Sequence, residues 1–594
     1  MAFQDFDHIS EIRRIDRQRK LRKRVAIALV AFILLVLIAV GIFAVVSSEE
    51  KEKEKEKEAR SSGDSSPKSV ARVQKLIKTI CNGTNYQASC SRTLSDAAKK
   101  NSSLNQPHQF IKVAVTAIDD EIDNAFNKAK GFNLKTPEEK AALKVCKKVI
   151  DDAKKDLKKV ISQVDTKNLL DQLHEKSPEL NNWLSAVMSY QQTCVDAFPE
   201  GDSSAQMEKN MNMTKQHTSN SLAIIKNFSC YLSSLKQTIG TSRRLLESIP
   251  HSLDSDGLPS WMSHEDRRAL KGNKKDDKDN IKADATVAKD GSGNFRSINA
   301  ALAAMPKQRK DRYVIYVKDG IYEETVTITQ EMTKVTLVGV GSQKAIVSGK
   351  KNVADRVNMY DTATLVVIGE EFMAKSMGFR NNAGPDKRRA VAARVQADHS
   401  VFVNCRFEGY QNTLWVQAHR QFYFNNVILG TIDIIFGDAM AIFQNTLIQV
   451  RKPPDGKQNS ILAQARVDKF ETTGFVLQNC RIEPHDSLKS VKNKVKSYLG
   501  RPWKEYSRSV VMESTINDLI DPKGWVAYKG DFGIKTVYFA EYNNKGSRAN
   551  TDSRVKWPGF KVIQKKEAVN YTVGSFFPGD WITKMGAPVH LGLY

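Results

Sequence analysis

Cysteine, acidic residues and cofactor motifs are all scarce in this sequence of 594 residues. Seven cysteines are too few for a disulfide-dense mini-scaffold, and the length favours two or more domains over a single core. None of the ten histidines has the spacing of a metal-ligand motif. The short glycine runs at Gly291 and Gly339 lack the helix that a phosphate-binding loop needs. We therefore expect neither a metal nor a cofactor.

The acidic residues do not balance the basic ones. The 67 Asp and Glu stand against 91 Lys and Arg, which gives a net charge of +24. Residues 281–594 alone hold 45 basic and 30 acidic residues, a net +15. Such an excess indicates a polyanionic partner: nucleic acid, an anionic membrane or an acidic polysaccharide. With 41% hydrophobic and 27% charged residues, the chain is neither a polytopic membrane protein nor a disordered acidic tail.

One long apolar run lies near the N-terminus. Residues 25–46 carry no charge over 22 positions, enough for a helix to cross a bilayer. Residues 1–24 hold eight Lys and Arg, so the positive-inside bias predicts a cytoplasmic basic segment, a transmembrane signal-anchor at 25–46 and export of the remainder. A cleaved signal peptide is the alternative. Both predict a precursor in the secretory pathway and disfavour nucleic acid as the partner.

The exported part begins with a charged linker at residues 47–69, which has no apolar period. Export also turns Asn-x-Ser/Thr triplets into candidate glycosylation sites. Five such triplets occur, beginning at Asn82, Asn101, Asn212, Asn227 and Asn570.

Residues 70–235 show helical apolar spacing, for example at Ile111, Val115 and Ile118. We expect an antiparallel four-helix bundle here. In an oxidising compartment two cysteine pairs could form, although the sequence alone does not fix the pairing. The candidate pairs are Cys81 with Cys90 and Cys146 with Cys194. A linker at 236–280 follows, and its run Arg243, Arg244, Leu245, Leu246 is a natural target for a processing protease.

A strand pattern with a fixed period marks residues 281–594. Short apolar strands repeatedly end in asparagine, at intervals of 21, 20 and 34 residues: Asn404, Asn425, Asn445 and Asn479. A period near 20 suits an all-β right-handed parallel β-helix, in which each coil buries its apolar face on its neighbours and the asparagines stack at a corner. An ordinary β-sandwich would require no fixed period.

The same period predicts a polar site on one face. Residues one coil apart lie about 4.8 Å from each other. Arg389, Gln411 and Asp433 follow one another at intervals of 22 residues, and Asn412 adjoins Gln411. We therefore expect these four side chains to converge on one exposed strip.

Two families share motifs with these parts. Residues 70–235 resemble the plant invertase and pectin methylesterase inhibitor domains in Ile80-Cys81, Cys90 and Gln192-Thr193-Cys194-Val195-Asp196-Ala197-Phe198. Residues 281–594 resemble the plant pectinesterases (pectin methylesterases) in Asp290 to Phe295, Tyr313 to Val317, Gly409 to Leu414, Gly430 to Gly437, Leu499 to Trp503 and Val555 to Gly559. The resemblance implies that the linker is cut at Arg243 to Leu246 and that the protein reaches the cell wall. It also implies an inhibitor-like pro-domain that covers the cleft during export, or else serves only in folding or spacing.

The pectinesterase resemblance implies a mechanism for hydrolysing galacturonate methyl esters in pectin. Asp433 matches the nucleophile, Arg501 the residue that orients it and Gln411 the donor to the oxyanion. The substrate-binding residues implied are Arg389, Met359, Trp503, Trp415, Phe436 and Trp525.

Several positions depart from the family pattern. The acid/base Asp is replaced by Asn412, which cannot donate and recover a proton at neutral pH. Arg389 stands where the family has Gln and Met359 where it has Thr. Asn426 and Thr446 together replace a pair of cysteines, so that disulfide is lost.

Three hypotheses follow. The protein is a pectinesterase slowed by Asn412, or it binds polygalacturonate without turnover, or its helical domain inhibits active esterases in trans.

Overall fold

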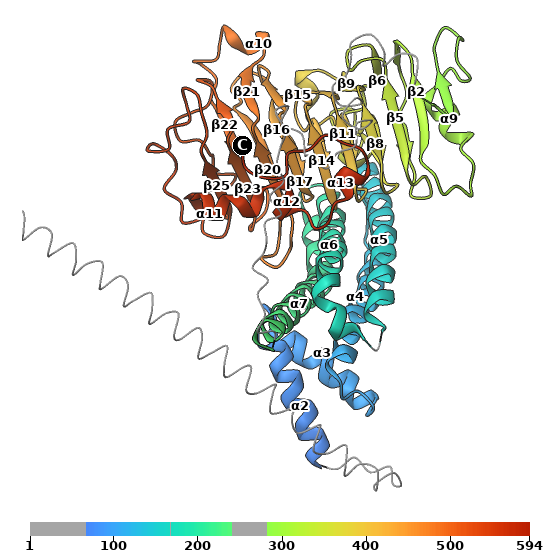
Figure 1. Ribbon diagram of the computed structural model, residues 1–594, viewed down its shortest axis with the longest axis vertical. Coiled ribbons are helices and arrows are strands. Elements are labelled where there is room, and N and C mark those ends of the chain that lie inside the picture. The colour runs from blue at the N-terminus through green and yellow to red at the C-terminus, as the bar shows by residue number, and fades with distance from the viewer. Residues whose placement is uncertain (1–66, 167, 240–281) are drawn as a thin grey trace, which may run out of the picture.

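The computed structural model of the chain describes residues 67–166, 168–239 and 282–594. The predicted signal-anchor at 25–46, nearly all of the linker at 47–69 and the processing residues Arg243 to Leu246 lie outside this part. Within the described residues no helix is both long and apolar enough to span a bilayer. Figure 1 shows a body of stacked strands with a group of helices standing against one side of it.

Among the described residues, six helices build the part of the chain before the β-helix. They are α2 (Pro67–Cys81), α3 (Gln87–Lys100), α4 (Pro107–Lys130), α5 (Pro137–Val164), α6 (Leu169–Asp196) and α7 (Asp202–Ile239). Helix α4 packs on α5 and α7, and α6 packs on both α5 and α7, which closes the predicted four-helix bundle. The N-terminus of α5 is fixed by a capping box, in which Thr136 accepts from the backbone of Glu139 and the Glu139 carboxylate accepts from the backbone of Thr136.

The helical part contains both predicted disulfides. Cys81 is bonded to Cys90, which ties α2 to α3, and Cys146 to Cys194, which ties α5 to α6. The predicted pairing is therefore confirmed. The three apolar side chains that indicated helical spacing, Ile111, Val115 and Ile118, are all buried in the bundle.

Three parallel sheets wind around one core in the C-terminal part. The first has 11 strands: β1 (Ala285–Val287), β2 (Tyr313–Val317), β5 (Val335–Gly339), β8 (Met373–Lys375), β11 (Ser400–Val403), β14 (Arg420–Phe424), β17 (Met440–Gln444), β20 (Gly474–Gln478), β23 (Arg508–Met512), β25 (Tyr538–Tyr542) and β26 (Phe560–Val562). The second has seven: β4 (Val326–Ile328), β7 (Leu365–Val367), β10 (Ala393–Val395), β13 (Leu414–Val416), β16 (Ile432–Gly437), β19 (Asn459–Gln464) and β22 (Ser497–Gly500). The third has eight: β3 (Gly320–Tyr322), β6 (Ala345–Gly349), β9 (Gly378–Asn381), β12 (Arg406–Glu408), β15 (Val427–Gly430), β18 (Leu447–Val450), β21 (Arg481–Pro484) and β24 (Thr515–Ile516).

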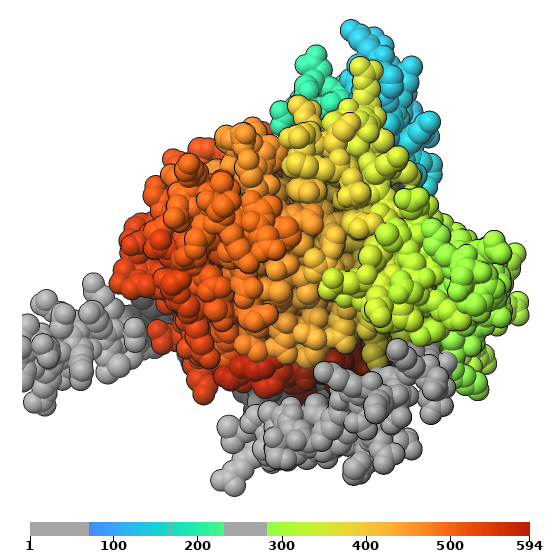
Figure 2. Space-filling view, turned by 90° about the horizontal axis from the view of Figure 1, so that it is seen from above, coloured from blue at the N-terminus to red at the C-terminus, as the bar shows by residue number. Residues whose placement is uncertain are grey.

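This arrangement is the predicted parallel β-helix. Each coil passes through the three sheets in turn, and Figure 2 shows the coils following one another along the body in chain order. Inside, aromatic rings stack from coil to coil, with Tyr423 between Phe402 at 5.0 Å and Phe443 at 4.5 Å. Burying these rings supplies the largest apolar areas in the core.

The four predicted corner asparagines adopt the left-handed conformation, with φ between 52° and 55°. Asparagine tolerates this region better than most residues. Their amides stack on the outside: Asn425 donates to Asn404 and Asn479 to Asn445, both at 2.7 Å. A ladder of asparagines at this corner was predicted, and it is confirmed.

A second, buried ladder follows the corner. The Asn426 side-chain oxygen accepts from the Cys405 backbone at 2.7 Å, and Thr446 Oγ1 accepts from the Asn426 backbone at 3.4 Å. Asn426 and Thr446 thus lie on adjacent coils, as the paired cysteines of the family would. Cys405 and Cys480 are buried at this corner, which agrees with a packing role.

Short helices complete the structure. They are α9 (Ile298–Ala303), η1 (Met359–Asp361), η2 (Pro385–Lys387), α10 (Asp486–Lys489), α11 (Lys565–Ala568), η3 (Val569–Tyr571), α12 (Val573–Phe576) and α13 (Trp581–Lys584). The last four form a C-terminal cover over the outer face of the 11-stranded sheet, where Phe577 and Trp581 pack with Phe422 and Ile442. No repeat predicted this cover.

Candidate active site

Asp433 lies on β16 at an irregular point of the seven-stranded sheet. The register between β16 and β19 shifts between Ile432 and Ile435, and Asp433 adopts a φ of 52°. Bulges of this kind turn a side chain away from the regular alternation of a strand. The Asp433 side chain is 14% exposed, so its carboxylate remains within reach of a ligand on the outer face.

Three hydrogen bonds hold the Asp433 carboxylate. Arg501 donates from Nε to Oδ1 at 2.7 Å and from Nη2 to Oδ2 at 2.6 Å, a bidentate pair. Ser460 Oγ donates to Oδ1 at 2.6 Å and accepts from the Asp433 backbone N–H at 3.0 Å. Burial alone would lower the pKa of the Arg501 guanidinium, but the Asp433 carboxylate has the larger effect and raises that pKa. The bidentate pair and the Ser460 hydroxyl therefore fix the direction of the carboxylate.

The coil register places the predicted polar residues on neighbouring coils, but Asn412 is buried and does not lie on an exposed strip as predicted. Arg389 pairs with Gln411 in a parallel bridge, and the Asn412 backbone donates to Ile432, the neighbour of Asp433, at 2.9 Å. Asn412 is 5% exposed, and its side-chain oxygen is buried without a hydrogen-bond partner in the described part of the chain. A buried carbonyl oxygen without a donor is costly, so it marks an unusual position.

A strip of apolar side chains runs beside this carboxylate. Trp415 stacks on Phe436 with ring centres 5.3 Å apart, and Phe436 lies 5.8 Å from Trp503. Met359, on η1, belongs to the same cluster. All four were predicted to bind substrate, and the structure brings them together.

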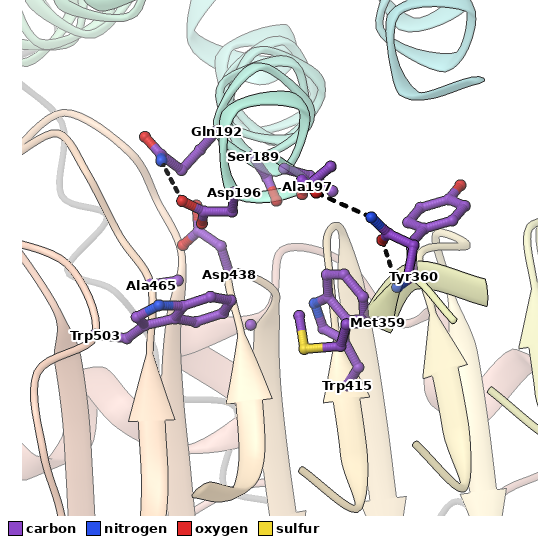
Figure 3. Close-up of a pocket in the computed structure, with 13 residues that line it drawn as sticks. Ser189, Gln192, Asp196, Ala197, Met359, Tyr360, Trp415, Asp438, Ala465 and Trp503 are labelled. Atoms are coloured by element: carbon purple, nitrogen blue, oxygen red, sulfur yellow. Dashed lines mark hydrogen bonds between the residues drawn. The ribbon is translucent and has the colours of Figure 1, made fainter. Parts of the chain in front are cut away.

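Helix α6 lies directly over the apolar strip. Every residue from Leu184 to Val195 is buried, because one face of α6 packs in the bundle and the other against the β-helix. Figure 3 shows its last turns facing Met359, Trp415 and Trp503. The gap between them is a cavity of about 20 Å³, room for about one water molecule. A polysaccharide has no access to this strip while α6 is in place.

Polar contacts fasten α6 to the β-helix. Ser189 Oγ donates to the backbone oxygen of Gln417 at 2.8 Å, and Asn358 donates to the backbone oxygen of Ala197 at 2.9 Å. Lys504 pairs with Asp196 at 2.7 Å. These contacts bury hydroxyl and amide groups with partners, as a stable interface requires.

A second group of ionic contacts joins α5 and α6 to the β-helix. His419 Nε2 lies 2.9 Å from a carboxylate oxygen of Asp156, and both side chains are buried. Arg420 pairs with Glu179 of α6 at 2.8 Å and also with Asp398. His419 meets Asp156, and Arg420 meets Glu179, only when the helical part lies against the β-helix.

One predicted substrate-binding residue lies elsewhere. Trp525 is 1% exposed in the interior, where it stacks on Phe539 at 4.4 Å and donates to Glu541 at 3.2 Å. The prediction that Trp525 contacts substrate is wrong, because core packing and the Glu541 hydrogen bond account for its position.

Sequence reasoning missed several residues of the site. Ser460 follows Asp433 by 27 residues, and the loop between β18 and β19 hides that it lies one coil away. Tyr528, whose ring lies 4.9 Å from the Arg501 guanidinium, is in an irregular loop with no periodic signal. Asp438 lines the small cavity under α6, and burial raises its pKa to about 6 beside Glu471.

The fold and the site together define a parallel β-helix protein with an arginine-bound carboxylate beside a covered apolar strip. Comparisons with known proteins make this class specific. Residues 284–580 match the Pectinesterase family and residues 75–224 match the family described as Plant invertase/pectin methylesterase inhibitor. The chain therefore belongs to the pectinesterase family and carries an inhibitor-family domain before the β-helix.

Individual relatives agree with this assignment. The chain is 47% identical over 613 residues to an Arabidopsis thaliana protein named pectinesterase/pectinesterase inhibitor 45, covering 100% of both chains. It is 49% identical to Arabidopsis thaliana pectinesterase/pectinesterase inhibitor 13, over 88% of this chain and 82% of the relative. Among solved structures, carrot pectin methylesterase is similar with a TM-score of 0.52 and 41% identity, over 53% of this chain and 99% of the carrot chain.

Proposed function

We propose that the β-helix hydrolyses methyl esters of galacturonate in pectin at Asp433, at a rate reduced by Asn412. The observation that carries this proposal is the Asp433 carboxylate, held by Arg501 and Ser460 on an outer face beside an apolar strip. A carboxylate that a guanidinium and a hydroxyl hold in one direction is suited to attack an ester carbonyl.

The chemistry proceeds in two steps. An Asp433 oxygen attacks the ester carbonyl carbon, and the carbon–oxygen bond to the methoxy group breaks, which leaves an acyl intermediate on Asp433. In this first step the methoxy group takes up a proton and leaves as methanol. Water then cleaves the acyl intermediate, which releases the galacturonate carboxylate, restores the Asp433 carboxylate and gives up two protons. The Gln411 amide is suited to stabilise the oxyanion. Asn412 offers no proton to the leaving group, so that proton comes from solvent and the step is slow.

The helical part, in this proposal, keeps the precursor inactive. The burial of Trp415 and Phe436 beneath α6 supports this function over a mere spacing role. Release requires a cut between the two parts. The dibasic run from Arg243 to Leu246 is the site at which a processing protease would cut.

The route through the cell follows from the sequence. We propose two domains, at 70–235 and 281–594, joined by a linker at 236–280. Residues 1–46 direct export, and the 25–46 helix anchors the chain in the membrane before processing. The processed protein acts in the cell wall. Glycosylation is compatible with the structure, since the five candidate asparagines are exposed.

The test is methanol release from methylated pectin. The full chain, with a specific protease site inserted in the linker, is assayed before and after cutting. We expect release only after cutting and separation, and none from Asp433→Ala treated in the same way. Equal, negligible rates for the wild-type and Asp433→Ala proteins would overturn the esterase.

A second candidate is binding of polygalacturonate without turnover. Two observations favour it: Asn412 has no titratable proton, and Arg389 places an exposed cation where the family has a neutral amide. Binding of de-esterified pectin by a cut protein that releases no methanol would favour this candidate.

A further inference from the structure

A cleft of about 700 Å³ lies between the ends of the helices and the β-helix, and its charges are sorted by side. All carboxylates that line it come from the helical part, and all cations come from the β-helix. The carboxylates are Glu138, Asp196, Glu200 and Glu208, and the cations are Arg356, Arg389, Lys504 and Lys529. Such a separation produces opposite potentials on facing surfaces.

Three of the cations pair with helical carboxylates across the cleft. The distances are 3.6 Å for Arg356 with Glu138, 2.7 Å for Lys504 with Asp196 and 3.4 Å for Lys529 with Glu200. Arg389 is exposed and has no acidic partner in the part of the chain that the structure describes. One cation of the row is therefore free while the helical part is in place.

The cleft adjoins the candidate active site. Trp503 and Met359 line both it and the small cavity under α6, and Tyr528 in its wall contacts Arg501. The cations thus stand along the surface on which the proposed substrate would lie. A chain of galacturonate without methyl esters carries one carboxylate per sugar, which suits a row of spaced cations.

We propose that the helical carboxylates occupy the positions where demethylated galacturonan binds, so that this polycarboxylate displaces the helical part from the β-helix. The demethylated galacturonan binds first to the unpaired Arg389. It then competes with the helical carboxylates for Arg356, Lys504 and Lys529. The proposal rests on the proposed function in taking galacturonan as the ligand of this surface. Fully methylated pectin lacks the charges and does not compete.

The exposure of the ion pairs favours such an exchange. In the Lys529–Glu200 pair the side chains are 66% and 93% exposed, and in the Arg356–Glu138 pair 79% and 36%. Exposed pairs contribute little to stability and are readily replaced by another anion. The Lys504–Asp196 pair is 18% and 22% exposed, which makes it the contact that yields last.

The first experiment measures binding to the uncut full chain by calorimetry at low salt. The probes are an oligogalacturonate without esters and the same oligomer fully methylated. We expect the free acid to bind and the ester not to, with affinity reduced about tenfold in Arg389→Gln, as expected for losing one charged contact. Arg481→Gln, which removes the same charge on the eight-stranded sheet, is the control and leaves affinity unchanged. Equal binding of acid and ester, or equal loss in both variants, would overturn the proposal.

The second experiment measures displacement. The full chain, cut in the linker, is titrated with each oligomer while separation of the two parts is followed by size-exclusion chromatography. We expect the acid form to release the helical part, and sodium chloride at equal ionic strength to release less. Binding without release, or equal release by salt, contradicts competition. Neither readout requires turnover, so absence of methanol release would overturn the esterase alone, while release of methanol without displacement would overturn this proposal alone.

Discussion

Asn412 retains the geometry of its position but not the chemistry of a carboxylic acid. Its φ of 63° lies in the left-handed region that Asn and Asp both tolerate, and its buried oxygen has no donor in the described structure. A carboxyl group placed here would adjoin Asp433 through the pairing of Asn412 with Ile432. The backbone and the surroundings of position 412 would therefore accommodate a carboxylic acid, but the residue there is an amide.

We predict that Asn412→Asp raises methanol release by about 10² to 10⁴, the usual contribution of a positioned acid/base group. The rate is measured on the cut and separated β-helix with methylated pectin. Asn404→Asp makes the same chemical change at an exposed corner with a φ of 55° and is expected to have no effect. No gain in Asn412→Asp would show that more than the missing proton limits the site.

Ser460 is a positioning residue for Asp433, since its hydroxyl bridges the carboxylate and the backbone of the same residue. In the Asn412→Asp background, Ser460→Ala should lower kcat about 10- to 100-fold with little change in KM, because a hydrogen bond to a charged group contributes about 1.5–3 kcal/mol. Ser460→Thr retains the hydroxyl and should restore the rate. A change in KM alone would place Ser460 in substrate binding instead.

At this scale the sequence predicted the Asp433–Arg501 pair only through resemblance, and predicted the approach of Arg389, Gln411 and Asp433 from the period itself. Ser460 and Tyr528 were not predictable in either way. An inserted loop breaks the spacing before Ser460, and Tyr528 reaches Arg501 from an irregular loop. Trp525 was wrongly predicted to contact substrate, because a sequence does not distinguish a tryptophan in the core from one in a cleft.

The corner between two strands shows how an element replaces a lost disulfide. Asn426 accepts from the Cys405 backbone, and Thr446 accepts from that of Asn426, so two buried N–H groups on adjacent coils are satisfied. Hydrogen bonds between coils thus occupy the position of the family's covalent link.

We predict that Asn426→Ala lowers the free energy of unfolding by about 1–3 kcal/mol, because the buried Cys405 N–H loses its acceptor. The change is measured by urea denaturation of the full chain, following the transition of the β-helix. Asn425→Gly, at the exposed neighbouring position with a φ of 54°, keeps the backbone conformation accessible and should cost less. Equal losses in the two variants would show that the buried ladder contributes no more to the free energy of unfolding than the exposed one.

The elements themselves were predictable to different degrees. Apolar spacing predicted the helices, and the repeat of asparagine corners predicted the β-helix, because both patterns follow directly from backbone geometry. The C-terminal cover of α11 to α13 was not predicted, since single contacts such as Trp581 on His399, with ring centres 4.7 Å apart, leave no period.

At the scale of the whole molecule, the docking of the two parts was the least visible feature in the sequence. The face of α6 toward the β-helix carries Ser185, Ser189 and Gln192, which in isolation resemble a solvent-exposed face. Only the structure shows that this polar face is buried against Gln417 and Thr472. The net charge of +24 likewise gave no indication that helical carboxylates face the cations of the β-helix.

Docking should depend on pH through the buried pair of His419 and Asp156. Burial, the largest single influence, lowers the pKa of His419, and so does the nearby charge of Lys159. The carboxylates of Asp156 and Asp398 together have the larger effect, so the pKa of His419 is raised above the usual 6.5. Burial also opposes the charge on Asp156, whose pKa is nevertheless lowered below 3.8 by His419 and Lys159. The stabilisation from His419 is thus complete below pH 6.5 and is lost as the pH rises through its raised pKa. The stabilisation from Asp156 is complete above pH 3.8 and is lost in stronger acid.

We therefore predict that the helical part binds the β-helix more tightly near pH 5.5 than near pH 8, by up to about tenfold for each unit by which docking shifts the pKa of His419. The affinity between the two parts of the cut chain is measured across this range at constant ionic strength. His419→Gln removes the titrating group of this pair and should reduce the slope of the profile, whereas His485→Gln, at a partly buried position away from α5 and α6, should leave the slope unchanged. A profile that keeps its slope in His419→Gln would assign the pH dependence to another group, because no other side chain of this pair gains a proton in that range.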